Sequence, residues 1–336
     1  MTHQVKKAKA VFFNEAGSAE VLKLNIIDMP EPKDDEVLIE VKSIGLNRAD
    51  AMYRMGMYVE SPVFPAKLGY EAAGLIKEVG TGLKTIFQKG DVVSIIPAFS
   101  LHQYATYGDY IIAPGYAVQK HSANITFDEA AALWTSYLSM YGMLIDAGSI
   151  QEGDHVVINA ASSSTGLAAI QIVNYCGGIP IALTSADHKR DGLLNAGAKY
   201  VIDTSQNDFN KKILEITHGK GVNIILDPVA GKNFSKLLDT ITEYGKVFVY
   251  GVLSFEEALF PAFTVLMKTP VIRGYNAMEI LGNPEKLSNA VKFIRKGVEE
   301  GAFKPKIDRN FSLDEIVAAH KYMEGNSQLG KVIVNP

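Results

Sequence analysis

A repeat of strand-like and helix-like segments constrains the fold of this chain more than any other feature. It opens at residues 155–171, HVVINAASSSTGLAAIQ, where a short apolar strand leads through small residues into a helix that begins near Thr165. Such alternation predicts a parallel sheet with helices on both faces. Strands are expected at 156–159, 180–184, 200–202, 223–226 and 246–250, a sixth at 271–273, and helices at 166–175, 188–195, 209–217 and 233–242.

The loop after the first of these strands is typical of a dinucleotide-binding unit. In such units, phosphate lies on backbone N–H groups at a helix N-terminus. Ser162, Ser163 and Ser164 stand where the glycine fingerprint has two of its glycines, and Gly166 remains. A serine Cβ holds the backbone farther from phosphate, but its hydroxyl can donate a hydrogen bond to it. We interpret residues Ser162 to Gly166, with Thr165, as a phosphate-binding loop; an ordinary turn and a loop that has lost binding are the alternatives.

The segments on either side of the repeat predict a second domain. Residues 1–126 are mostly short β-type runs separated by glycine and proline, which resembles a distorted barrel. A helix is expected from Phe127 to Gly142 and another from Pro284 to Glu300, and a capping box from Ser312 to Glu315 opens a last helix before a final strand at 331–334. We therefore expect a first domain over 1–126, a nucleotide-binding domain over 127–270, and a return to the first domain over 271–336.

Composition excludes several classes of protein. Of the 336 residues, 47% are hydrophobic and 21% charged, as in a globular protein with a large core. The net charge of −4 and the absence of a basic run argue against a nucleic-acid partner. We find neither a secretory signal nor an apolar run long enough to cross a membrane, and expect a cytoplasmic protein. Cys176 is the only cysteine, which excludes an internal disulfide.

Motifs spread over the whole chain resemble one family. They are VLIEVKSIGLNRAD, LGYEAAGLIKEVG, GDVV, AASSSTGLAAIQ, AGAKYVID, LDPVAG, GKVFVYG and LGKVIV. In this order they resemble the medium-chain dehydrogenase/reductase superfamily, and within it the zinc-independent quinone oxidoreductase-like branch. The resemblance implies an α/β protein, with a Rossmann doubly wound parallel sheet beside a GroES-like β-barrel catalytic domain and the active site in the cleft between them. It also implies a homodimer or homotetramer.

Two positions in these motifs decide the question of zinc. Zinc-using relatives have a cysteine where this chain has Asn47 and a histidine where it has Tyr70. A catalytic zinc normally needs three ligands drawn from Cys, His and carboxylate side chains. We therefore predict no metal site.

The end of the second strand of the repeat bears on the cofactor. Rossmann units that bind NAD carry an acidic residue there, which holds the ribose hydroxyls. This chain has Ser185 at that point, followed by Lys189 and Arg190, which suit a 2′-phosphate. We therefore predict NADPH rather than NADH. The alternative is that both cations decorate a helix surface, and Asp187 is an acidic residue in the same segment.

The resemblance implies three further cofactor contacts. Ser139 matches a threonine that touches the carboxamide, although a serine bonded to its own helix is an alternative. Gly251, Val252 and Leu253 would pass beside the nicotinamide ribose. Lys331 would reach the pyrophosphate, unless it is a surface lysine.

Tyr58 and Asn47 are the predicted catalytic residues. Tyr58 matches a catalytic tyrosine of related enoyl-thioester reductases and is a possible general acid or substrate clamp; the alternative is an aromatic ring packed under a loop. Asn47 could hydrogen-bond the substrate oxygen or the cofactor, and Asp50 could instead cap the helix that follows. The predicted function is an NADPH-dependent, zinc-independent reductase that transfers hydride to a small-molecule electrophile, a quinone or an α,β-unsaturated carbonyl. The alternatives are an enoyl-thioester reductase that uses Tyr58, and a non-catalytic NADPH-binding or redox-sensing protein.

Overall fold

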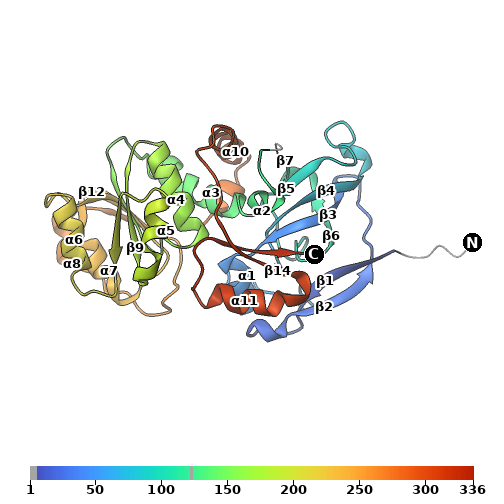
Figure 1. The fold of residues 1–336 in the computed structure, drawn as a ribbon, viewed down its shortest axis with the longest axis horizontal. Coiled ribbons are helices and arrows are strands. Elements are labelled where there is room, and N and C mark those ends of the chain that lie inside the picture. The colour runs from blue at the N-terminus through green and yellow to red at the C-terminus, as the bar shows by residue number, and fades with distance from the viewer. Residues whose placement is uncertain (1–5, 122–123) are drawn as a thin grey trace, which may run out of the picture. The chain divides into compact units, whose positions relative to one another are not determined.

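The computed structural model describes residues 6–121 and 124–336 (Figure 1). Its contacts divide the chain into two units. The first, which we call the barrel unit, contains residues 1–135 and 305–336. The second, the Rossmann unit, contains residues 136–304.

The barrel unit is built around a long central strand, β3 (Glu36–Gly45), which pairs with β4 (Glu71–Val79) and β6 (Tyr110–Pro114). The final strand of the chain, β15 (Lys331–Asn335), pairs with the far end of β3, as the predicted return to the first domain requires. The remaining strands are β5 (Val92–Ile95), β7 (Val118–Lys120) and β14 (Ile307–Ser312) in the same sheet, and β1 (Lys7–Phe12) with β2 (Lys23–Asp28) in a separate pair.

Two helices of the barrel unit carry the buried side chains of Asp50, Arg54 and His320. The helix α1 (Arg48–Arg54) follows β3 directly and contacts α11 (Ile316–Glu324). The side chains of β3, β4 and these helices enclose a core of aliphatic and aromatic residues, among them Val37, Ile39 and Tyr53. This apolar surrounding is the reason that a charge on either helix can be shielded from water.

The Rossmann unit contains a six-stranded sheet in the order β10-β9-β8-β11-β12-β13, and every pairing is parallel. The strand order reverses between β8 and β11, the point where open α/β sheets bind ligands beyond their carboxyl ends. The strands are β8 (His155–Ile158), β9 (Ile179–Thr184), β10 (Tyr200–Asp203), β11 (Val222–Asp227), β12 (Ile241–Val249) and β13 (Val271–Gly274).

The helices of this unit lie largely where the alternation places them, and α4 packs along β8 and β9 (Figure 1). A single helix over 127–142 is not observed, because α2 and α3 are separated by a turn and α3 runs on into a π-helical turn at Gly142–Asp146. The helix α2 (Phe127–Ala130) and the start of α3 (Trp134–Tyr141) lie in the barrel unit. The helices that follow are α4 (Ser164–Tyr175), α5 (Arg190–Asn195), α6 (Phe209–Ile216), α7 (Phe234–Leu238), α8 (Ala262–Lys268), α9 (Met278–Leu281) and α10 (Pro284–Glu299).

The boundaries of the units differ from the predicted 126 and 270. Residues 127–135 belong to the barrel unit because Ala130, Ala131 and Ala132 pack against Ala73 and Ile333. Residues 271–304 belong to the Rossmann unit because β13 completes its sheet and the Phe293 ring of α10 packs against Tyr141 and Tyr175. Pattern alone did not show which sheet the sixth strand and α10 would join.

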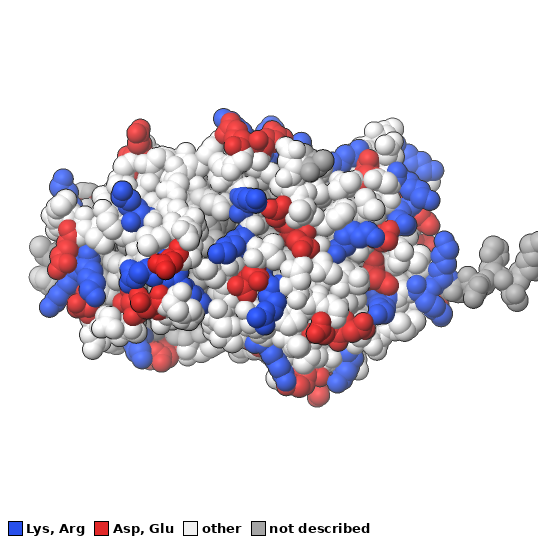
Figure 2. Space-filling view, in the orientation of Figure 1, with Lys and Arg blue, Asp and Glu red and all other residues white. Residues whose placement is uncertain are grey.

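Acidic and basic side chains are interspersed over much of the face in Figure 2, in keeping with the small net charge. Among the helices of the described residues, none combines the length and the apolar character needed to cross a membrane.

Candidate functional site

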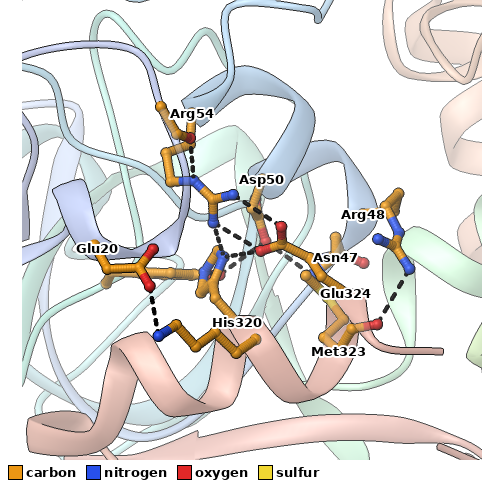
Figure 3. Close-up of polar contacts among 11 residues, drawn as sticks. Glu20, Asn47, Arg48, Asp50, Arg54, His320, Met323 and Glu324 are labelled. Atoms are coloured by element: carbon orange, nitrogen blue, oxygen red, sulfur yellow. Dashed lines mark hydrogen bonds and ion pairs between the residues drawn. The ribbon is translucent and has the colours of Figure 1, made fainter. Parts of the chain in front are cut away.

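Asp50 and Arg54 of α1 face His320 and Glu324 of α11 inside the barrel unit (Figure 3). They belong to a connected group of polar side chains, which we call the buried cluster. Most of its members are at most 7% exposed, and only the Glu324 side chain, at 21%, reaches water appreciably. The cluster consists of Asn47, Asp50, Arg54, Glu71, Tyr107, His320, Glu324 and Lys331.

Asn47 is the residue that caps α1, and its side chain is fully engaged as a donor. Its Nδ2 donates to the Gly45 carbonyl at 3.2 Å and to Glu71 Oε2 at 3.0 Å, while its Oδ1 accepts from Lys331 Nζ at 2.7 Å. Since an amide nitrogen carries two protons, no donor remains for a substrate oxygen in this arrangement. A catalytic contact between Asn47 and a substrate therefore stays a prediction. Such a contact would use the remaining lone pair of Asn47 Oδ1, or it would require the side chain to change its hydrogen-bond partners.

Lys331 forms the more deeply buried of the two ion pairs with Arg54 or Lys331 in the cluster. Its Nζ lies 2.6 Å from Glu71 Oε2, and both side chains are 1% exposed. The other carboxylate oxygen of Glu71 accepts from the Thr135 amide at 2.7 Å. The lysine predicted to reach a pyrophosphate is thus buried and neutralised by a carboxylate, and that contact would require it to leave Glu71.

Asp50 is completely buried, and its two oxygens differ in their surroundings. Oδ2 accepts from the Asn47 amide at 2.8 Å and from the Tyr107 hydroxyl at 3.0 Å. Among the described residues, Oδ1 has no hydrogen-bond partner. Burial raises the pKa of Asp50 to about 7, against the opposing effects of these two hydrogen bonds and of Lys331. The proposed capping role of Asp50 is confirmed, because its carboxylate holds the first amide of the α1 cap.

The direction of the hydrogen bonds behind Asp50 follows from Arg54. A guanidinium only donates, so Arg54 Nη1 donates to His320 Nδ1 at 2.8 Å. The neutral imidazole then carries its proton on Nε2, which lies 3.1 Å from the Tyr107 oxygen. Tyr107 in turn donates to Asp50. Burial lowers the pKa of His320 and raises that of Tyr107 well above its usual value, so both groups stay neutral.

Glu324 anchors the outer end of the buried cluster. Its two oxygens accept from Arg54 Nη1 at 2.8 Å and Nη2 at 3.0 Å, a bidentate pair. Burial works to raise the pKa of Glu324, but the contacts with His320 and Arg54 outweigh it and bring the pKa to about 2. Arg54 is therefore fixed in place and paired.

Tyr58 lies at one end of a row of aromatic rings in the barrel unit. Its ring centroid is 6.1 Å from that of Tyr70, which lies 6.0 Å from Phe99, which lies 5.9 Å from Tyr104. Burial, and then the nearby charge of Asp50, raise the pKa of Tyr58, while a hydrogen bond with Tyr70 lowers it. Burial and the neighbouring Tyr58 and Asp50 likewise raise the pKa of Tyr70. Both tyrosines are therefore neutral hydroxyls near the Asp50 carboxyl group.

In the Rossmann unit, the serine loop forms a helix cap. Ser163 is the N-cap of α4, and its Oγ accepts from the Gly166 amide at 3.0 Å. A Cβ on Gly166 would lie 2.6 Å from the Ala161 backbone, so this close approach of the helix to the loop after β8 accounts for the one glycine that remains. The free amides of this twelve-residue helix suit a phosphate group.

Two predicted cofactor residues from different strands meet at this loop. Lys189, which follows β9, is 5% exposed, and its Nζ donates to Ser162 Oγ at 3.2 Å. Arg190 is directed elsewhere: its Nε pairs with Asp187 at 2.9 Å and its Nη1 donates to the Val201 carbonyl at 2.7 Å. The structure thus separates the two predicted cations, and only Lys189 contacts the loop.

A cavity of about 200 Å³ lies beyond the carboxyl ends of the parallel strands. Of the predicted residues, Ser185 lines it. The sequence interpretation missed Asn159, Thr204, Lys232, Asn233 and Ser254, although their positions just after strands of a parallel sheet were a usable signal. The other lining residues are Ala160, Leu183, Thr184, Phe209, Val229, Ala230, Leu237 and Glu256.

Asp227, at the end of β11, holds the loops around this cavity. Its Oδ1 accepts from Asn159 Nδ2 at 2.8 Å and from the Val229 amide at 2.9 Å, and both its oxygens lie 3.2 Å from the Ala230 amide. Ala160 and Ala230 adopt φ of 50° and 57° in these loops. Such conformations are costly for residues with a Cβ and are often kept at ligand sites.

The remaining predicted cofactor residues also lie in the Rossmann unit. Ser139 is a half-buried residue of α3. Gly251, Val252 and Leu253 follow β12, and the Leu253 amide donates to the Pro228 carbonyl at 2.9 Å, which ties this segment to the loop after β11. A Cβ on Gly251 would lie 2.8 Å from the same carbonyl oxygen.

No metal-binding group of three His, Cys, Asp or Glu side chains occurs within residues 6–121 and 124–336. Asn47 and Tyr70, at the positions of the two zinc ligands, are an amide engaged with Lys331 and a neutral tyrosine.

Comparison with known proteins agrees with both units. The family model described as "Alcohol dehydrogenase GroES-like domain" matches residues 33–138, and "Zinc-binding dehydrogenase" matches residues 164–297. Human quinone oxidoreductase is 30% identical over 331 residues, 98% of each chain. The solved structure of Escherichia coli quinone oxidoreductase complexed with NADPH is 25% identical, with a TM-score of 0.87 and coverage of 98% of this chain and 100% of that one. A structure named as an NAD-dependent alcohol dehydrogenase is 26% identical, with a TM-score of 0.90 and coverage of 98% and 99%.

These similarities and the two sheets confirm the predicted fold, a Rossmann parallel sheet with a GroES-like domain. The Rossmann unit is of the kind that binds a nicotinamide cofactor. The chain belongs to the medium-chain dehydrogenase/reductase superfamily and is an oxidoreductase of its quinone oxidoreductase-like group.

Proposed function

We propose that this protein is an NADPH-dependent reductase of quinones or other activated carbonyl compounds that works without zinc. The observation that carries the proposal is the contact between Lys189 Nζ and Ser162 Oγ, which joins the segment after β9 to the loop before α4. The same loop offers serine hydroxyls and free helix amides, beside a cavity that Ser185 lines. This arrangement fits a dinucleotide with a 2′-phosphate at the end of β9.

The preference for NADPH rests on charge. The Lys189 ammonium lies beside the loop, and the first residue after β9 is Ser185, so no carboxylate at that point would repel a 2′-phosphate. The similar E. coli enzyme is described in complex with NADPH, whereas the alcohol dehydrogenase is named as NAD-dependent. We also propose that the cofactor contacts Ser139, Ser164, Thr165 and residues 251–253.

The cofactor would supply the hydride, and the barrel unit would bind and protonate the acceptor. Tyr58 and its aromatic neighbours suit a planar, apolar acceptor such as a quinone. A neutral tyrosine can also donate a hydrogen bond to a carbonyl oxygen as negative charge develops on it. The same hydroxyl would serve an enoyl thioester, which makes that substrate class the second candidate.

The decisive experiment is to mix the protein with NADPH and a panel of quinones, enones and enoyl thioesters and to follow NADPH absorbance. We expect saturable oxidation of NADPH with at least one quinone or enone, unchanged by a zinc chelator. Turnover confined to enoyl thioesters would favour the second candidate. If the protein binds NADPH but no acceptor oxidises it, the proposal of a reductase would be overturned and a redox-sensing role would be supported.

We also propose that two copies associate through an apolar patch of the Rossmann unit. Helix α8 has no buried residue, and Phe263 is 77% and Leu266 73% exposed. Helix α8 contacts β12, and β13, which pairs with β12, is the edge strand of the sheet in the described part of the chain. A second copy would offer the same apolar helix and the same edge, as a two-fold interface requires. The patch consists of Val252, Phe255, Leu259, Phe260, Phe263, Leu266, Met267 and Val271.

We also propose that the protein is located in the cytoplasm.

A further inference from the structure

Residues 56–65 of the barrel unit, which we call the Tyr58 segment, follow α1 and have no regular secondary structure. The first two amides of the segment donate to carbonyls of α1 at 2.9 Å. Among the described residues, no hydrogen bond between main-chain groups holds residues 58–65. Several apolar side chains of the segment are between 44% and 70% exposed, namely Met57, Val59, Val63 and Phe64. Burial of these side chains therefore contributes little to its position.

Glu60 ties the Tyr58 segment to a turn at residues 99–104, which we call the Phe99 turn. Glu60 Oε1 accepts a hydrogen bond from the Ser100 hydroxyl, and its Oε2 accepts from the Leu101 amide at 3.1 Å. The Ser100 oxygen itself accepts from the His102 amide at 3.1 Å, which leaves the hydroxyl proton for Glu60. Both oxygens of one carboxylate are thus used to join the two parts of the chain.

The imidazole ring of His102 reinforces this contact. A carbonyl oxygen only accepts, so His102 Nε2 donates to the Ser61 carbonyl at 2.7 Å. Its Nδ1 lies 3.3 Å from Glu60 Oε1. The Phe99 turn therefore contacts Glu60 and the residue that follows it.

The Phe99 turn is itself fixed to the core of the barrel unit. Phe99 is 9% exposed, and the Tyr104 hydroxyl donates at 2.9 Å to Glu36, the first residue of β3. The ring of Tyr70 lies between the two parts, with its centroid 6.0 Å from that of Phe99 and 6.1 Å from that of Tyr58. The relative positions of these rings therefore depend on how closely the Tyr58 segment is held to the Phe99 turn.

We propose that Glu60 is a positioning residue that determines which acceptors the protein reduces. It holds the Tyr58 segment on the Phe99 turn, and so fixes the Tyr58 ring against Tyr70 and Phe99. Rings fixed in this way offer a surface for a flat quinone of fused rings, and a quinone with bulky groups out of its plane fits poorly. This inference rests on the proposed function, and Glu60 acts through Tyr58 without touching the acceptor.

Reduction of two quinones by NADPH tests the role of Glu60 in acceptor choice. The first, 9,10-phenanthrenequinone, is flat, whereas 2,6-di-tert-butyl-1,4-benzoquinone carries bulky groups out of its plane. In Glu60→Ala we expect the KM for the flat quinone to rise about tenfold with kcat changed less than about twofold, because the lost contacts bind ground state and transition state alike. The ratio of kcat/KM for the flat to the bulky quinone should fall by about the same factor. A residue that only stabilised the fold would lower both values of kcat/KM together.

Three further variants show whether the hydrogen bonds of Glu60 carry the effect. Glu60→Gln keeps one oxygen that can accept, so its ratio should lie between those of the wild type and Glu60→Ala. Ser100→Ala should lower the ratio in the same direction, and adding it to Glu60→Ala should change little, because both substitutions remove one contact. The matched control is Glu20→Ala, which removes an ion pair with Lys321 elsewhere in the barrel unit and should leave the ratio unchanged.

Hydrogen–deuterium exchange of the whole protein tests the contact without turnover. The Leu101 amide donates to Glu60 and should exchange slowly in the wild type. In Glu60→Ala, peptides from residues 56–65 and 99–104 should exchange about tenfold faster, with the rest of the barrel unit unchanged. Glu20→Ala should change neither peptide, and NADPH affinity should stay the same in every variant. If Glu60→Ala does not fold, Glu60→Gln and Ser100→Ala decide.

The outcomes separate the role of Glu60 from the reductase activity. If the wild type reduces quinones but Glu60→Ala changes neither the ratio nor the exchange of the two peptides, the role of Glu60 is overturned and the reductase stands. Faster exchange with an unchanged ratio overturns it as well, because the contact would then have no influence on acceptor choice. A wild type that reduces neither quinone, nor any other acceptor, overturns the proposed function and with it the choice of acceptor.

Discussion

At the residue scale, the serine loop before α4 combines a side-chain helix cap with a close backbone approach at Gly166. Ser163 takes over the capping of α4 by accepting from the Gly166 amide, and its own hydroxyl proton remains available for a phosphate oxygen. Gly166 is retained where a side chain would meet the Ala161 backbone. The substitution therefore falls where the backbone tolerates a Cβ.

Replacing Lys189 with alanine tests the cofactor preference. We expect NADPH affinity to fall by roughly ten- to a hundredfold, since hydrogen bonds to charged groups contribute about 1.5–3 kcal/mol. NADH affinity should hardly change. Titration of cofactor fluorescence measures both. The matched control is Arg190→Ala, which should have a smaller effect because Asp187 and the Val201 carbonyl already hold that guanidinium. Equal losses for NADPH and NADH would contradict the 2′-phosphate assignment.

The raised pKa of Asp50 also predicts a pH-dependent stability. Between the unfolded pKa of about 3.9 and the folded value of about 7, the native state binds more protons than the unfolded state. Stability contributed by the protonated carboxyl is therefore complete below the lower value and is lost as the pH rises through the upper one, by about 4 kcal/mol in all. Denaturant unfolding of the wild type and Asp50→Asn at several pH values measures it. The stability difference between them should slope across this window, and a constant difference would rule out the raised pKa.

At the element scale, an ion pair connects β15 with β4 although β3 lies between these strands in the sheet. Lys331 at the start of β15 reaches Glu71 at the start of β4, and the side-chain amide of Asn47, two residues beyond the end of β3, contacts both. One buried network of polar contacts thus connects the ends of the three strands. Its contribution to the stability of the protein depends on both charges being present.

We predict that Glu71→Gln destabilises the protein by about 3–5 kcal/mol, because the Lys331 ammonium is left buried without its counter-charge. The double variant Glu71→Gln with Lys331→Met should recover a large part of that loss. Urea unfolding of the wild type, both single variants and the double variant gives the coupling energy. Strict additivity of the two single effects would mean that the pair does not interact as the structure indicates.

The elements differ in how far sequence could predict them. The parallel strands were predictable because apolar runs recur with helices between them, and the capping box at Ser312 marked the start of α11. The strand β2, KLNIID, was missed because polar residues interrupt it and it is largely exposed. Asn47, Tyr58 and Lys189 could be singled out by motif. The contact of Tyr107 and Arg54 with His320 could not be predicted, because these residues meet only through distant segments, 266 residues apart for Arg54 and His320.

At the scale of the whole molecule, the apolar patch of the Rossmann unit sets the expected assembly. An exposed helix with Phe263 and Leu266 beside an open sheet edge would be an aggregation risk in a monomer. The proposed two-fold contact would cover both features at once.

Replacing Phe263 and Leu266 with glutamate should therefore convert a dimer into a monomer, because two charges would be placed in an apolar interface. Analytical ultracentrifugation of the wild type and the double variant measures the mass. The control Ile26→Glu, a 63% exposed residue of β2 in the barrel unit, should leave the mass unchanged. A monomeric wild type, or a dimer that survives the double substitution, would contradict the proposed interface.

The interrupted course of the barrel unit has a consequence for synthesis on the ribosome. The Rossmann unit, residues 136–304, is continuous in the chain and can fold once α10 has emerged. We expect the barrel unit to complete its folding only after β15 has emerged, because among the described residues Lys331 is the cation paired with the buried Glu71. Until then, the first 135 residues form an incomplete sheet with an open edge on β3. The nascent chain is thus most exposed to misfolding while the Rossmann unit is being made, and chaperone binding should concentrate on the early segment.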